Sequence, residues 1–350
     1  MSLVLLLALV ALALVAAGVL YQSVGAVRSA RRCPPPGTMI DAGGHRVHVV
    51  CRGEGTPAVV FEAGIAASSL SWARVLPAVG AFTRACAYDR AGLAWSELSP
   101  QPRTLERIVA ELDAVIAGLS ISAGPILVGH SFGAFVVAAY ASSHPTRIAG
   151  LVLVDPPAPG EWYPVTRERE RLLWGGIQLS RIGGILARIG VVRACLALLT
   201  GGAPGVPRNF VKIFGATAAR TLERLVGEVQ KLPPEIYPIV QAHWCQPRCF
   251  RAMADYMRTL EETAAFMASL RTLPDVPLVV ISSAQQPDDV RAAQRQLARL
   301  TRHGEHVVAG ASGHWIQFDE PDMLVLVIRD LVNRVRGIES VTNNAKAAKT

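Results

Sequence analysis

Residues 125–133 read Pro-Ile-Leu-Val-Gly-His-Ser-Phe-Gly, and this stretch decides the fold. An apolar run of strand length leads into Gly129, and a longer uncharged run follows at residues 132–141. These runs predict a buried strand and a buried helix joined by a very tight turn. Side chains at the two glycine positions would clash in such a turn, which lifts Ser131 out beside a helix N-terminus. The pattern Gly-x-Ser-x-Gly therefore predicts a nucleophilic serine.

Outward from this stretch, short β-rich runs alternate with helical segments. Predicted strands cover residues 45–51, 57–61, 85–88, 125–129, 150–154, 277–281 and 306–309. Predicted helices cover residues 68–82, 103–119, 132–141, 289–300 and 321–335. Strands that alternate with helices are typical of a mostly parallel sheet with helices on both faces, so the predicted fold class is α/β.

One interval breaks this alternation. Residues 157–273 contain helical segments only, predicted at 167–173, 177–199, 218–231 and 249–270. An interval this long between two strands must be a structure of its own, and we expect an inserted all-helical lid. The core is then formed by residues 38–156 and 274–337, and the polar residues 338–350 are expected to be a disordered tail.

The N-terminal region has the composition of a membrane segment. No charged side chain precedes Arg28, and residues 3–20 are an unbroken apolar stretch, close to the length of about 20 residues that spans a bilayer. We expect a single-pass N-terminal transmembrane helix within residues 1–27 and a linker over residues 28–37. A signal segment cleaved after Ala17, leaving a secreted or periplasmic protein, is the open alternative.

The composition excludes several classes of protein. Charged residues make up 18% of the chain and hydrophobic residues 51%, so a disordered chain is excluded. The net charge of +8 comes mostly from dispersed arginines, so no nucleic-acid partner is expected. The sequence has neither a Cys–His metal spacing nor a phosphate-binding Gly-rich loop, so it predicts no metal and no cofactor.

Several further motifs resemble those of the α/β-hydrolase family, over about residues 38–336 apart from the lid. Tyr88-Asp89-Arg90-Ala91-Gly92, followed by Ser96, is similar to the family's loop after the fourth strand. It departs from the family pattern at Ala94, where a second glycine is usual. Glu62-Ala63-Gly64 stands where relatives commonly carry His-Gly, and Gly313-His314 follows the last strand, as the family's catalytic histidine does.

The resemblance implies three catalytic residues in the chain order Ser, acid, His. Ser131 is the expected nucleophile, and His314 is the one histidine in a loop after the last strand, where it can act as base. The expected acid is Asp155, which ends the sixth strand, as the acid does in some family members, and precedes two prolines. Asp288 and Asp289, after the next strand, are the alternative, although both also suit the first turn of a helix.

Two expectations concern the neighbours of these residues. The backbone N–H groups of Ile65 and Phe132 are expected to form the oxyanion hole, because they follow the third strand and the nucleophile respectively. Asp89 lies near the same sheet edge as the acid, but we expect it to pair with Arg90.

The cysteines and arginines bear on the compartment. The family's sheet order makes the second and fourth strands neighbours, so it implies that Cys51 and Cys86 are close enough to bridge. Such a bridge would favour an oxidising compartment, while buried free thiols are the alternative. Arg28, Arg31 and Arg32 follow the apolar stretch and favour the cytoplasmic side, so the sidedness stays open.

The resemblance implies a serine hydrolase that cleaves an ester, thioester or amide through an acyl-enzyme on Ser131. Apolar lid segments favour a small to medium hydrophobic acyl substrate. A serine at the elbow disfavours epoxide hydrolysis and dehalogenation, because relatives with those activities carry Asp there. Two alternatives stay open: an acyltransferase or cofactor-free peroxidase-like enzyme on the same fold, and a non-catalytic membrane-tethered binding protein.

Overall fold

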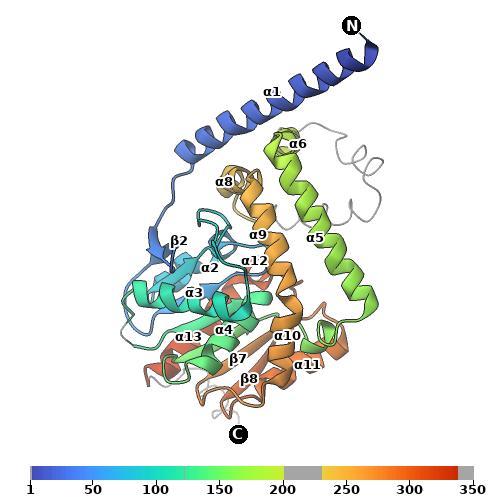
Figure 1. Ribbon diagram of the computed structural model, residues 1–350. Helices are drawn as coiled ribbons and strands as arrows, with labels where there is room; N and C mark the ends of the chain where they lie inside the picture. Colours follow the sequence, from blue (N-terminus) through green and yellow to red (C-terminus); the bar gives the residue numbers. More distant parts are fainter. Residues whose placement is uncertain (1, 122, 201–230, 338–350) are drawn as a thin grey trace. The chain divides into compact units, whose positions relative to one another are not determined.

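The computed structural model describes residues 2–121, 123–200 and 231–337 (Figure 1). The chain forms two compact units, one of Met1–Pro35 with Trp174–Ala254 and one of Pro36–Leu173 with Asp255–Thr350. The segment predicted as a lid therefore contributes residues to both units. The predicted helix at 218–231, apart from its last residue, and the predicted tail at 338–350 lie outside the described residues.

The larger unit is built on one eight-stranded sheet. The strand order is β1-β2-β4-β3-β5-β6-β7-β8, in which β1–β2 and β2–β4 are antiparallel and the other pairs are parallel. The strands are β1 (Thr38–Asp41), β2 (Arg46–Arg52), β3 (Val59–Glu62), β4 (Ala85–Tyr88), β5 (Ile126–His130), β6 (Gly150–Val154), β7 (Leu278–Ser283) and β8 (Gly304–Ala309). The predicted mostly parallel α/β sheet is confirmed, and the short edge strand β1 is an addition to it.

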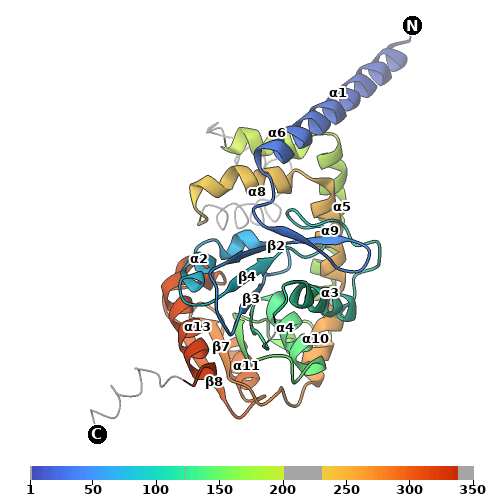
Figure 2. The ribbon, with the colours of Figure 1, turned by 90° about the vertical axis from the view of Figure 1, so that its left-hand side faces the viewer.

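Helices cover both faces of this sheet. Figure 2 shows α2 (Val75–Gly80) and α13 (Pro321–Val335) on one face, and α3 (Leu105–Gly118), α4 (Phe132–Ser143) and α10 (Leu260–Ser269) on the other. On the α2 and α13 face, a core of buried residues includes Phe61, Trp72 and Ile328. Shorter elements complete the unit: the 3₁₀ helices η1 (Ser69–Trp72) and η2 (Pro159–Glu161), and the helices α11 (Asp288–Ala298) and α12 (Ile316–Asp319).

The central strands are buried along their whole length. Every residue of β5 and of β6 is buried, which is expected for parallel strands covered on both faces and explains why their sequences are continuous apolar runs. The antiparallel pairing of β2 with β4 sets Cys51 opposite Cys86, with their Cα atoms 4.1 Å apart, and the two residues form a disulfide. The implied proximity of these cysteines is confirmed.

The smaller unit is helical. Its helices within the described residues are α1 (Leu3–Arg32), α6 (Val191–Thr200), α8 (Tyr237–Trp244), the part of α5 (Arg167–Arg188) after Leu173 and the part of α9 (Pro247–Arg258) before Asp255, with the 3₁₀ helix η3 (Pro234–Ile236). The helix α1 continues through residues 28–32, where the sequence predicts a linker. A single helix predicted at 249–270 is two helices, α9 and α10, that meet at Thr259.

The two halves of α1 have different surroundings. The large apolar side chains between Leu3 and Leu20 are exposed, and this helix is long and apolar enough to cross a membrane, a property that signal sequences share. The second half packs against α6 and α8, beside which it lies in Figure 2. There Gln22 is buried, and a side chain at Gly18 would collide with the Ile189 carbonyl. The second half of α1 is thus part of the folded unit.

Candidate active site

The turn between β5 and α4 presents Ser131 at the carboxyl edge of the sheet. Ser131 has φ 53° and ψ −123°, a strained conformation that residues other than glycine rarely adopt. A Cβ atom at Gly129 would lie 2.4 Å from the Gly133 carbonyl oxygen, and one at Gly133 would lie 2.5 Å from the Ala63 carbonyl oxygen. Both positions of the motif therefore require glycine because backbone atoms pass too close for any side chain.

The structure brings His314 and Asp155 together. The Nδ1 atom of His314 lies 2.7 Å from Asp155 Oδ2, a normal hydrogen-bond distance, although 159 residues separate them in the sequence. Asp155 directly follows β6, has a left-handed φ of 41° and is fully buried. By contrast, Asp288 starts α11, pairs with Arg291 and has a side chain that is 93% exposed. Asp289, the next residue of α11, is also exposed.

Three further donors hold the Asp155 carboxylate. The Ser283 N–H donates to Oδ1 over 3.1 Å, the Gln286 side chain to Oδ2 over 2.6 Å, and the Gln294 side chain to Oδ1 over 3.0 Å. Burial alone would raise the pKa of Asp155, but the hydrogen bond and charge of His314, with the other donors, outweigh it and lower that pKa. The carboxylate is therefore kept ionised beside the imidazole.

The sequence patterns predict no role for Gln286 and Gln294. Gln286 lies in the loop after β7, where family members usually carry the acid, and Gln294 is the seventh residue of α11. A glutamine in that loop is a signal that the acid stands elsewhere, because an amide can donate to a carboxylate but cannot replace it.

His130, between Gly129 and Ser131, has a role beyond filling the turn. Its Nε2–H donates to the His314 carbonyl over 2.9 Å, and its ring lies 4.7 Å from the His314 ring and 4.8 Å from the Trp315 ring. The ring is fully buried, and this burial, together with the nearby His314, lowers the pKa of His130 to about 3. His130 is therefore a neutral side chain that holds the backbone of the His314 loop.

The candidate oxyanion donors lie close to the serine. A Cβ at Gly64, the residue before Ile65, would lie 3.6 Å from Ser131 Cβ, so the loop after β3 runs directly beside the turn. Within the described residues, neither the Ile65 N–H nor the Phe132 N–H donates a hydrogen bond to the protein. Among these described residues, the Ser131 hydroxyl also makes no hydrogen bond to His314. Catalytic hydrogen bonds are often long before a substrate binds.

The expected pairing of Asp89 with Arg90 is wrong. Asp89 accepts hydrogen bonds from His48 Nδ1 over 2.8 Å and from the Ser69 N–H over 2.7 Å, whereas the Arg90 guanidinium pairs with the Glu62 carboxylate. Successive residues in an extended chain point to opposite sides, so neighbours that directly follow β4 reach different partners.

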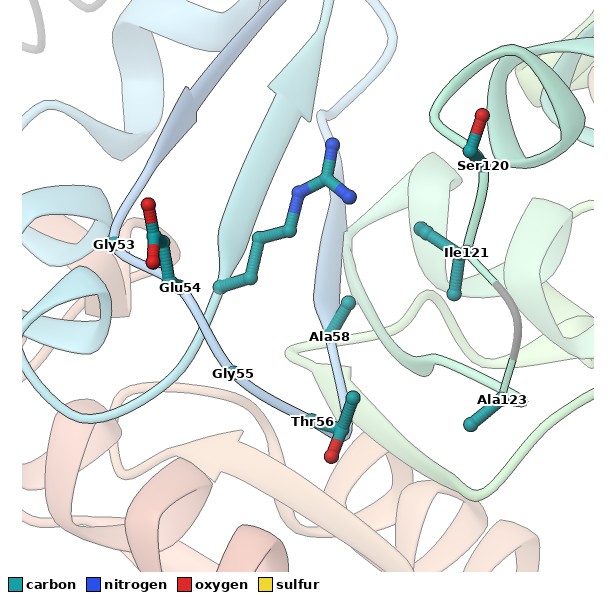
Figure 3. A pocket seen from close by; sticks show the side chains of 9 residues that line it. Gly53, Glu54, Gly55, Thr56, Ala58, Ser120, Ile121 and Ala123 are labelled. Carbon is teal, nitrogen blue, oxygen red and sulfur yellow. The ribbon is translucent and has the colours of Figure 1, made fainter.

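An open cavity of about 510 Å³ lies at the other edge of the sheet (Figure 3). Its lining comes from the segment before β3, the residue before β4 and the connection before β5. It comprises Gly53, Glu54, Gly55, Thr56, Ala58, Arg84, Ser120, Ile121 and Ala123. These segments stand at the amino ends of the parallel strands, whereas Ser131, Asp155 and His314 follow the carboxyl ends of theirs. The cavity is therefore separate from the candidate active site.

Comparison with known proteins places the chain in a family. Residues 59–325 match the model of the alpha/beta hydrolase family, and the chain belongs to that family. Among curated proteins, it is 33% identical over 109 residues to the uncharacterized protein YqjL of Bacillus subtilis (strain 168), a match that covers 30% of this chain and 42% of YqjL. The chain thus spans less than half the length of the curated relatives it matches.

Solved structures show the same fold at low sequence identity. A thermophilic esterase from Thermogutta terrifontis superposes with a TM-score of 0.59 and 18% identity, covering 85% of this chain and 98% of the esterase. The enol-lactonase from Burkholderia xenovorans LB400 superposes with a TM-score of 0.57 and 19% identity, covering 85% of this chain and 100% of the lactonase. The chain is therefore an alpha/beta hydrolase in fold and in family.

Proposed function

We propose that this protein is a serine hydrolase that cleaves an ester, thioester or amide of a small to medium hydrophobic molecule. The observation that carries the proposal is the buried Asp155 carboxylate, 2.7 Å from His314 Nδ1, at the sheet edge where Ser131 stands in a strained turn. The partly exposed Trp315 ring adjoins His314 in the sequence, which favours a hydrophobic acyl group.

The proposed reaction has two acyl-transfer steps, the first to Ser131 and the second to water. The Ser131 oxygen attacks the acyl carbon, and its proton passes to His314 Nε2 and then to the leaving group, whose bond to that carbon breaks. Water, activated by the same nitrogen, then releases the acid and restores the serine. Asp155 fixes the imidazole tautomer with Nδ1 protonated, and the N–H groups of Ile65 and Phe132 bind the tetrahedral oxyanion.

A fluorophosphonate reagent tests the nucleophile. We expect the purified full-length protein to be phosphonylated at Ser131, as located by peptide mass spectrometry, and Ser131→Ala to be unlabelled while it unfolds at the wild-type temperature. Labelling that persists in Ser131→Ala would contradict the proposal.

Hydrolysis of p-nitrophenyl butyrate in the presence of alcohols then separates a hydrolase from an acyltransferase, because a transferase yields the new ester in preference to the free acid.

We further propose that α1 is an uncleaved membrane anchor rather than a signal sequence. The support is the length of the apolar stretch at residues 3–20, which exceeds the about 7–15 residues usual in the apolar region of a signal sequence. The helix α1 also runs without a break through Ala17, the candidate cleavage position, to Arg32. The intact N-terminus should therefore be recovered by mass spectrometry from the membrane fraction, and a mature chain that begins after Ala17 would reject the anchor.

A further inference from the structure

The Arg90 side chain is buried against the backbone that leads into Ile65. Its NH1 group donates to the Ala63 carbonyl over 2.6 Å, and its NH2 group donates to the Gly64 carbonyl. The side chain is 1% exposed, and its charge is balanced by the Glu62 carboxylate, which begins the same segment. One planar guanidinium thus binds two successive carbonyls, a geometry that suits the fixed fork of arginine donors.

Peptide geometry connects this contact to the candidate oxyanion hole. The Gly64 carbonyl and the Ile65 N–H belong to one planar peptide unit, and in a trans peptide the two groups point in opposite directions. A guanidinium that holds the carbonyl therefore sets the direction of the N–H on the other side. Its positive charge also polarises the peptide, which strengthens the N–H as a donor.

Arg90 also contacts the second segment that carries a candidate oxyanion donor. Its guanidinium carbon lies 5.3 Å from the centroid of the Phe132 ring and 4.8 Å from that of the Tyr256 ring. Both distances are within the range of cation–π attraction. Phe132 is the first residue of α4, and the Tyr256 hydroxyl donates to the Ala91 carbonyl over 3.0 Å. Arg90 therefore joins the segment after β3 to the start of α4.

We propose that Arg90 is a positioning residue that aims the Ile65 N–H at the oxyanion formed on Ser131. The inference rests on the proposed serine hydrolase function. Preorganised donors lose their value when they are misdirected, and loss of one oxyanion donor costs roughly 10²–10³ in kcat. Removal of the guanidinium should therefore weaken the binding of tetrahedral species far more than the binding of substrate.

A second buried arginine provides a matched control. Arg103 has a side chain that is 5% exposed, pairs with Glu111 over 3.0 Å and lies 5.3 Å from the same Tyr256 ring. Within the described residues it makes no hydrogen bond to the Ala63 or Gly64 carbonyl. Its removal disturbs the same buried network of charges without touching the segment that leads into Ile65.

The experiment compares Arg90→Met with Arg103→Met in the full-length protein. The readouts are kcat and KM for p-nitrophenyl butyrate and the Kd of phenylboronic acid, whose adduct with the serine is tetrahedral. We expect Arg90→Met to lower kcat and boronate affinity by roughly 10²-fold or more, with KM within about threefold of wild type. Arg103→Met should unfold at a lower temperature but keep kcat and boronate affinity within about threefold.

Equal losses of kcat and boronate affinity in the two variants would overturn the inference, because they would show a general structural effect. If Arg90→Met does not fold, Arg90→Lys takes its place. A single ammonium group cannot hold both carbonyls in the plane of the fork, so kcat and boronate affinity should still fall about tenfold, and wild-type values would overturn the inference. Failure of the proposed function is distinguishable, because wild-type protein would then not be phosphonylated at Ser131.

Discussion

In the unit built on the sheet, buried charged side chains lie at the carboxyl ends of the strands, whereas in the helical unit buried polar contacts of Gln22 join α1 to its neighbours. Asp155, Glu62 and Arg90 belong to the first group, and Gln22, with its partner Arg193, belongs to the second. A buried polar group that loses its partner costs roughly 1–3 kcal/mol, so these contacts mark what each unit must hold in place. In one unit these are the candidate reacting groups, and in the other it is the N-terminal helix.

The largest expected effects are losses of activity at Ser131 and His314, in the unit built on the sheet. Because the serine forms the proposed covalent bond, Ser131→Ala and His314→Ala should each lower kcat/KM by roughly 10⁵-fold or more. Both side chains are partly exposed, so the melting temperature should change little. Ester hydrolysis and thermal unfolding of the purified variants check this. If Ser131→Ala hydrolysed the ester at the wild-type rate, the reaction would not take place at Ser131, Asp155 and His314.

Asp155 tests whether the buried carboxylate orients the histidine. Asp155→Asn keeps the size of the side chain but should lower kcat by about 10⁴-fold, because the amide favours the wrong imidazole tautomer. The control is Asp288→Asn, at an exposed position that starts α11. It should leave kcat within about twofold and change stability by less than about 1 kcal/mol. Similar activity losses in both variants would contradict the assignment of the acid.

The buried His130 side chain should make the free energy of unfolding depend on pH. Its pKa is lowered from 6.5 to about 3 by burial and by the neighbouring His314. Between these values the unfolded chain binds a proton that the folded chain does not, so the free energy of unfolding falls as the pH falls. In His130→Gln, whose amide can still donate to the His314 carbonyl, this slope should decrease by about 1.4 kcal/mol per pH unit between about pH 6 and pH 4.

Urea unfolding at several pH values measures that slope. His303→Gln is the control, because the His303 side chain is 61% exposed and the substitution should leave the slope unchanged. An unaltered slope in His130→Gln would show that the proton is taken up elsewhere.

The sequence predicts those site residues that a local pattern marks, but not those whose role depends on contacts with residues far away in the chain. Ser131 and His314 could be proposed as site residues because a local motif marks one and a position after the last strand marks the other. Asp155 could be proposed because it ends a recognisable strand. The roles of His130, Arg90 and Gln294 could not be predicted, because their partners are set by packing. Gln294, for instance, meets the Asp155 carboxylate across 139 residues of sequence.

The same distinction applies to the fold. The strands of the parallel sheet could be predicted because burial on both faces leaves continuous apolar runs. The end of α1 could not, because an apolar pattern locates the stretch that suits a membrane but not the packing that continues the helix to Arg32. In the packed part of α1, Gly18 and Gly25 lack the side chains that would collide with Ile189 and Arg193.

The smallest expected effect is at Gln22, and it tests the packing of α1 in the helical unit. The Gln22 amide donates to the Cys245 carbonyl, and its oxygen accepts from Arg193 Nε over 2.9 Å. Gln22→Leu leaves the Cys245 carbonyl and the Arg193 Nε–H without this partner, so it should destabilise the helical unit by roughly 1–3 kcal/mol. Hydrogen exchange of the α8 amides should quicken, while kcat stays unchanged. Ser23→Leu, at the next and exposed position, should alter neither. Unchanged exchange in Gln22→Leu would mean that α1 is a tether and not part of the folded unit.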